Sequence, residues 1–131
     1  MDLQQIKQAL NAGDCPQLRE FITGYIECLL WSSSDDNGES LEFYNLSKSA
    51  HEKCVNDCRE FITGNLDDLQ EYAGALSWGN AGHDFWLTRN GHGAGFWDRG
   101  LDALGERLTK AAHDFGGIDP YLNDDTNEVE I

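Results

Sequence analysis

The segment AGHDFWLTRNGHGAGFWDRG, residues 81–100, decides the fold because aromatic residues flank a glycine-rich centre on both sides. Phe85 and Trp86 precede the string NGHGAG, and Phe96 and Trp97 follow it. Apolar runs around a Gly/Asn cluster are typical of a β-hairpin, whose turn needs residues that accept a positive φ. The segment therefore predicts a hairpin in which residues 83–89 pair with residues 95–98.

Helical patterns fill the first part of the chain. Residues 1–13 have the spacing of a short amphipathic helix. Asp14 and Pro16 mark the expected start of a second helix. The Asp14 carboxylate can cap free backbone N–H groups, and Pro16 suits the first helical turn. It should end near Trp31, where the polar, turn-rich residues 32–40 predict a surface loop.

Two more helices are expected before the aromatic segment. Ser49 and Glu52 have the spacing of a capping box, which predicts a helix from there to Gly64. Asn65 is the expected cap of a short helix that follows. Residues 74–82 are rich in small residues and are expected to form a connection.

The remainder of the chain completes an α+β fold. Residues 101–115 predict an amphipathic helix, residues 118–122 a return strand, and residues 123–131 a frayed acidic tail in which 128–131 could add an edge strand. The expected architecture is a group of N-terminal helices followed by a β-β-α-β unit, whose small antiparallel sheet packs on the helices. One domain should span residues 1–131, mainly helical over residues 1–80.

The chain is strongly acidic, with 24 Asp and Glu residues against 9 Lys and Arg and a formal net charge of −15. Each of the ranges 1–50, 51–100 and 101–131 holds eight acidic residues, so acidity extends over the whole molecule. Such a charge argues against nucleic acid or an anionic membrane as a ligand and favours a basic protein partner. A solubilising surface is the simpler interpretation, and imitation of DNA phosphates is the more specific one.

Four cysteines occur without an N-terminal secretory signal pattern, which favours a reducing cytosol and free, buried thiols. No membrane-spanning segment and no catalytic residue are assigned from the sequence. No cofactor is assigned either, because Gly91, Gly93 and Gly95 match neither a dinucleotide-binding fingerprint nor a P-loop.

The aromatic segment and the acidic residues supply the candidate partner-binding residues. Exposed carboxylates would steer a basic partner, and exposed tryptophans would anchor it, although core packing is the default for the aromatic residues. The residues selected are Asp35, Asp36, Glu39, Asp67, Asp68, Glu71, Trp86, Arg89, His92, Trp97, Asp102 and Glu106.

A metal site is the alternative interpretation of the hairpin. Imidazole and carboxylate groups suit a divalent transition metal, and His83, Asp84, His92 and Asp98 would lie near one another if the hairpin formed. The side chains of His83 and Asp84 would point to opposite faces of a strand, which limits such a site. This alternative predicts a small metal-dependent hydrolase.

The segments LLWSSSDDNGESLE, residues 29–42, and AGHDFWLTRNGHGAGFWDRG, with Tyr121-Leu122-Asn123-Asp124-Asp125 near the end, resemble a family of small bacteriophage, prophage and plasmid proteins. The resemblance covers roughly residues 29–125 and carries over no catalytic residue. It implies a mobile-element protein that binds a host protein, as an inhibitor of a restriction, CRISPR or regulatory complex. An accessory partner of another phage protein is the other expectation.

Overall fold

The computed structural model describes residues 2–13 and 15–131, so the predicted cap at Asp14 lies outside the described residues. The chain is an α+β protein in which a small sheet lies at one end of a group of helices. Its helices are α1 (Leu3–Ala12), α2 (Pro16–Ser32), α3 (Lys48–Gly64), α4 (Leu66–Ala75), α5 (Trp78–Arg89), the short 3-10 helix η1 (Phe96–Asp98) and α6 (Ala103–His113). The strands are β1 (Asn45–Leu46), β2 (Tyr121–Asn123) and β3 (Glu128–Glu130).

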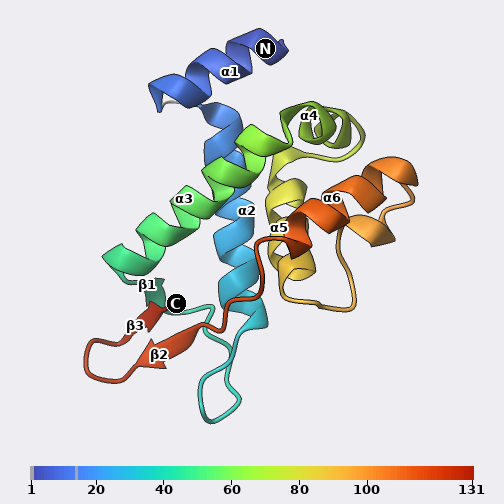
Figure 1. Cartoon of the computed structure of the whole chain (residues 1–131). Helices are drawn as coiled ribbons and strands as arrows, with labels where there is room; N and C mark the ends of the chain where they lie inside the picture. The colour runs from blue at the N-terminus through green and yellow to red at the C-terminus, as the bar shows by residue number, and fades with distance from the viewer. Residues whose placement is uncertain (1, 14) are drawn as a thin grey trace.

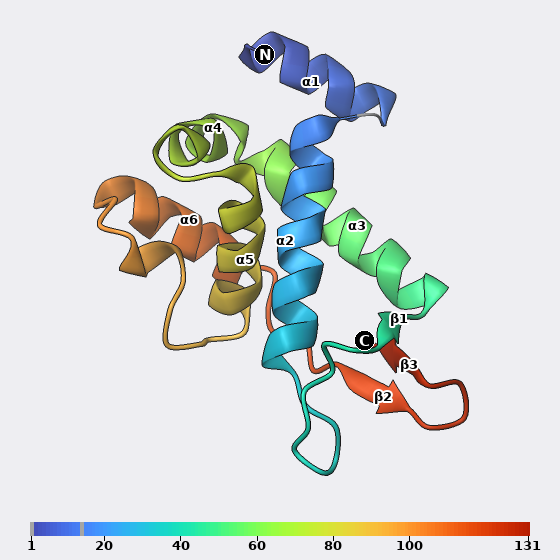
Figure 2. The ribbon, with the colours of Figure 1, turned by 180° about the vertical axis from the view of Figure 1, so that it is seen from behind.

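Helices α2 and α5 lie side by side at the centre of the molecule, with α3 and α6 on either side (Figure 1). The reverse view shows the same central pair, with α1 at one end and the sheet at the other (Figure 2). One hydrophobic cluster draws buried residues from all the α-helices and from β3. The aromatic residues at its centre include Phe61 and Phe85, whose rings stack with centroids 4.1 Å apart.

Glycines allow the central helices to approach closely. A Cβ atom added at Gly82 of α5 would lie 2.0 Å from the carbonyl oxygen of Phe21, and one added at Gly24 of α2 would lie 2.1 Å from that of Gly79. Neither distance is compatible with any side chain. Gly24 and Gly82 therefore allow the backbones of α2 and α5 to come into contact.

The predicted hairpin is wrong, and so is the β-β-α-β unit that contained it. Residues 83–89 belong to α5, which begins at an N-cap, Ser77, whose hydroxyl accepts a hydrogen bond from the Asn80 N–H. A turn follows, in which Gly91 adopts a φ of +69°, and Phe96 and Trp97 belong to η1. Helix α5 is buried on most of its circumference, so it lacks the one-sided apolar pattern by which a surface helix is recognised.

The sheet has the strand order β1-β3-β2, with β1 parallel and β2 antiparallel to β3. It is therefore mixed, in contrast to the predicted antiparallel sheet. Residues 128–131, predicted as part of a frayed tail that could add an edge strand, contain β3, which is the central strand and not an edge. Val129 is fully buried and pairs with both Leu46 and Leu122. The predicted return strand is shorter than expected and forms an edge, β2.

The helices predicted in residues 1–13, 16–31, 49–64, 65–74 and 101–115 are confirmed within a few residues. Their predicted caps differ in detail. The Ser47 hydroxyl, and not that of Ser49, accepts the capping bond of α3, from the Ala50 N–H at 3.0 Å. The Asn65 side chain does not cap α4 but donates to the carbonyl of Phe61. Within the described residues, none of the helices is long and apolar enough to cross a membrane.

The four cysteine thiols are free and buried, as predicted. Burial raises the pKa of the Cys28 and Cys54 thiols to about 12 and raises that of Cys58 well above its usual value. An unfolded thiol ionises near pH 8.5. These groups are thus held neutral in the folded protein over a range in which they ionise in the unfolded chain.

We therefore expect the protein to lose stability at alkaline pH. The contribution of the buried thiols is fully present below about pH 8.5 and falls as the pH rises toward 12, because the unfolded state releases protons that the folded state retains. Urea unfolding at pH 7.5 and at pH 10 measures the loss. Cys28→Ala and Cys54→Ala should each reduce the difference between the two pH values, and an unchanged difference would contradict the expectation.

Candidate partner-binding surface

A groove runs between two segments that are distant in the sequence, residues 32–37 and residues 118–124. It consists of two adjoining hollows of about 560 and 400 Å³ that share Ser34, Asp119 and Pro120. Asp35 and Asp36 lie on one wall, Asp119 and Asp124 on the other, and His92 borders one end. We call this feature the acidic groove.

The first wall is a loop that its own backbone and Asp35 hold in place. The Asp35 carboxylate accepts hydrogen bonds from the N–H groups of Asn37 and Glu39, each at 2.9 Å. The loop closes through the isolated bridge between Ser34 and Ser40, and the fully buried Leu41 anchors it to the core. The wall is therefore ordered before any partner arrives, which lowers the entropic cost of binding.

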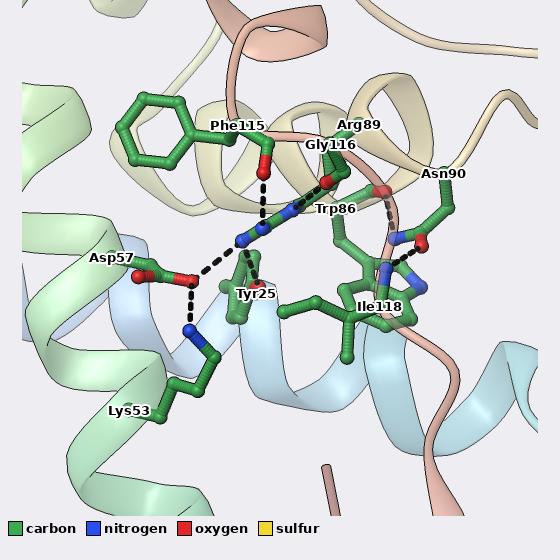
Figure 3. A network of polar contacts seen from close by, with 9 residues as sticks. All are labelled: Tyr25, Lys53, Asp57, Trp86, Arg89, Asn90, Phe115, Gly116 and Ile118. Carbon is green, nitrogen blue, oxygen red and sulfur yellow. Dashed lines mark hydrogen bonds and ion pairs between the residues drawn. The ribbon is translucent and has the colours of Figure 1, made fainter.

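The second wall is attached to the core by Arg89, the last residue of α5. Its guanidinium donates to the carbonyl oxygens of Gly116 and Phe115, at 2.8 and 3.1 Å, and to Asp57 and the Tyr25 hydroxyl, at 2.8 and 3.0 Å (Figure 3). The Arg89 carbon Cζ also lies 5.3 Å from the ring centre of Phe85. Burial raises the pKa of the Tyr25 hydroxyl far above its ordinary value, so Tyr25 remains a neutral partner.

Asn90 extends this attachment toward the groove. Its side-chain oxygen accepts a 2.7 Å hydrogen bond from the Ile118 N–H, and its amide nitrogen donates to the carbonyl of Trp86 (Figure 3). Trp86 in turn donates from its indole N–H to the Ser32 hydroxyl of the first wall, at 2.8 Å. The end of α5 therefore sets the position of both walls.

The acidic groove lies where two of the long stretches without Lys or Arg, residues 20–47 and residues 111–131, meet. Residues 20–47 and residues 111–131 contain six acidic residues each and no Lys or Arg, so half of the 24 acidic residues lie in these two stretches. The ion pairs between described residues use Asp57, Asp68 and Asp84, which lie outside both stretches. The residues that line the groove accordingly include Asp35, Asp36, Asp119 and Asp124 but no Lys or Arg.

The predicted partner-binding residues are distributed over several surfaces. Asp35, Asp36 and His92 line or border the acidic groove, and Glu39 is exposed on the same loop. A second acidic surface holds Asp67, Asp68 and Glu71 of α4 together with Asp102 and Glu106, at the start of α6. Asp68 pairs there with Arg107 at 3.0 Å, and Trp97 lies elsewhere, on η1, with 53% of its surface exposed.

Two of the predicted residues cannot contact a partner in this structure. Trp86 is 1% exposed and Arg89 is 6% exposed, because both belong to a helix inside the molecule and not to a surface hairpin. Phe85 and Phe96 are likewise fully buried, so core packing accounts for the aromatic segment except at Trp97.

The structure separates the residues of the metal alternative. Asp84 is fully buried; both of its carboxylate oxygens are bonded to Arg99, at 3.0 and 2.7 Å, and one of them also accepts from the Tyr72 hydroxyl at 2.5 Å. The hydrogen bonds that Arg99 donates to Asp84 raise the pKa of the Arg99 guanidinium. His83 borders a different hollow from His92. Among the described residues, no group of three or more His, Cys, Asp or Glu side chains could hold a metal ion.

Sequence analysis did not select Asp119, Tyr121 or Asp124, which line the second wall of the groove. Counting charges in thirds of the chain conceals them, because each third has the same number of acidic residues. A search for long stretches without Lys or Arg finds residues 20–47, 60–88 and 111–131, and only the fold shows that the first and the last of these meet at the groove. Comparisons with family models, with curated proteins and with solved structures gave no significant match.

Proposed function

We propose that this protein is a non-catalytic binding protein that attaches to the basic surface of a partner protein through the acidic groove. The observation that supports this proposal is the segregation of charge, because carboxylates line both walls of the groove and each wall belongs to a long stretch without Lys or Arg. A surface that only promotes solubility needs no concave, single-sign region held in place by a buried network.

Charge complementarity determines how such a surface acts. A negative groove attracts a positive surface over about one Debye length, roughly 8–10 Å in physiological salt, and so accelerates the encounter. Tyr121 lies among the carboxylates and is 56% exposed, so it offers an aromatic contact for an Arg or Lys side chain.

The more specific form of the proposal is mimicry of DNA. DNA carries about one negative charge per 1.7 Å of its axis, and a DNA-binding protein offers a basic surface matched to such charge. The resemblance to phage and plasmid proteins leads us to propose a host defence or regulatory complex in the bacterial cytosol as the target. An accessory role toward another phage protein uses the same groove with a different basic partner.

The test is capture of a partner from bacterial lysate on the tagged protein at about 50 mM and then about 500 mM salt, followed by mass spectrometry. The variant D35N/D36N/D119N/D124N removes four charges from the groove. The matched control D67N/E71Q/D102N/E106Q removes four charges from the surface of α4 and α6. We expect a basic protein on the wild type and on the control at low salt, and about tenfold less of it on the groove variant.

The outcome also separates the two forms of the proposal. Release of the captured protein by added duplex DNA supports DNA mimicry, whereas insensitivity to DNA supports another basic partner. Equal capture by the groove variant, or capture that persists unchanged at high salt, would contradict the role of the acidic groove.

A further inference from the structure

The outer face of α2 carries an apolar stripe that no other element fully covers. Ile22, Ile26 and Leu30 recur at intervals of four residues and are only partly buried. They border a hollow of about 370 Å³ that Leu46 of β1 and His51 of α3 complete. Trp31, next to Leu30, is 63% exposed. Exposed apolar surface of this kind marks interaction sites.

The hollow lies where two helices diverge. Helices α2 and α3 cross near the end of α3 and separate toward its beginning, where β1 lies between them (Figure 1). From Ile22 to Leu30 the stripe is about 12 Å long, or roughly two helical turns. Side chains spaced four residues apart form a ridge on a helix surface, and the groove beside such a ridge accepts a ridge of another helix.

The charges around this surface indicate the kind of helix. Glu27 lines the hollow and also borders a second hollow on its other side, with Glu20, Gly79 and His83. The lining contains no Lys or Arg. On α3, His51 of the lining lies in sequence between Lys48, the exposed first residue of the helix, and Lys53, which pairs with Asp57 at 3.6 Å.

We propose that this apolar groove, formed by Ile22, Ile26, Leu30 and Leu46 with Glu27 at its rim, binds an amphipathic helix of a partner protein that carries Lys or Arg beside its apolar face. The partner's positive charge rests on the proposed function; the helical shape rests on the groove itself. A second copy of this chain is disfavoured as the occupant, because two molecules with a net charge of −15 repel each other.

The probe is a synthetic peptide of about 18 residues built from Leu and Lys, with Leu at i, i+3, i+4 and i+7 spacing. Its control has the same Leu positions, with Glu in place of Lys. Binding to the full chain is followed by methyl NMR of the Ile and Leu residues and by calorimetry. We expect the Leu/Lys peptide to bind, with shifts at Ile22, Ile26 and Leu30, and the Leu/Glu peptide not to bind.

Variants then locate the site. Ile26→Thr and Trp31→Ala should each lower the affinity of the protein for the Leu/Lys peptide about tenfold, as removal of an anchor does. Glu27→Gln should lower this affinity by a smaller factor and make the binding less dependent on salt. Trp97→Ala is the matched control, because Trp97 is also an exposed tryptophan but lies on η1, and it should change the affinity less than twofold. If Ile26→Thr does not fold, the methyl shifts at Ile22, Ile26 and Leu30 in the wild type locate the binding site instead.

Several outcomes would overturn the inference. Binding that moves signals at the acidic groove and is lost in D35N/D36N/D119N/D124N, but not in Trp31→Ala, would reject the α2 site and leave the proposed function standing. Equal binding of the Leu/Glu peptide would reject a basic occupant. Binding of neither peptide would reject the helix site altogether. A dimer of the protein that Ile26→Thr abolishes would identify a second copy as the occupant.

Discussion

Gly82→Ala is expected to destabilise the protein by about 3 kcal/mol or more, at or beyond the upper end of the usual cost of overpacking. The added Cβ would lie 2.0 Å from the Phe21 carbonyl oxygen and 2.9 Å from the Tyr25 backbone nitrogen. Both are backbone atoms of α2, so no rotation of a side chain relieves the clash. Helices α2 and α5 would have to separate, and the aromatic core between them would lose its packing. Urea unfolding measures the change.

Gly74→Ala is the matched control. Gly74 is an exposed residue inside α4, and an added Cβ would meet no atom within 4 Å. Because alanine is the better helix former, this variant should be more stable than the wild type by about 0.5–1 kcal/mol. If Gly82→Ala cost no more than a few tenths of a kcal/mol, the close approach of α2 and α5 would be wrong.

Arg89→Met is expected to cost about 3–5 kcal/mol, as does removal of one partner from a buried ion pair. The Arg89 side chain is 3% exposed and that of Asp57 is 13% exposed, so the Asp57 carboxylate would lose its main partner in a place that water reaches poorly. The carbonyl groups of Phe115 and Gly116 would lose their donors as well. Urea unfolding gives the free energy, and amide hydrogen exchange should show faster exchange at residues 115–118.

The control for this prediction is Arg107→Met. Arg107 pairs with Asp68 on the surface, with exposed side-chain fractions of 54% and 25%, and exposed pairs contribute about 1 kcal/mol or less. If the two substitutions cost the same, the network around Arg89 would not hold the second wall of the acidic groove in the manner that Figure 3 shows.

The helices that sequence analysis predicted well are those with one apolar face. In α3, the buried residues Cys54, Cys58 and Phe61 recur at helical spacing, and α6 has the same property at Leu104 and Leu108. The pattern is visible in the sequence because water on one side of a helix selects polar residues there. The acidic character and the buried thiols were predictable for a similar reason, since composition alone carries them.

Helix α5 was not predictable in this way, and the predicted surface roles of Trp86 and Arg89 failed with it. Its residues face other parts of the protein on most sides, so no polar side marks the helical period. Gly82 and its neighbours look like turn residues, because a glycine that permits positive φ and one that permits close packing are identical in the sequence. Strand β3 presented the converse problem, since its acidic neighbours suggested a frayed tail while Val129 is fully buried.

The sequence by itself determined the α+β class, most of the helices, the excess of negative charge and the reduced, buried state of the cysteines. Each of these follows from local spacing or from composition. Only the tertiary structure decided that glycines of α2 and α5 join two helices, that Arg89 is an interior residue, and that residues 32–37 and 118–124 face each other across the acidic groove. Those features depend on contacts between residues that are distant along the chain, and local patterns carry no information about which distant segments will meet.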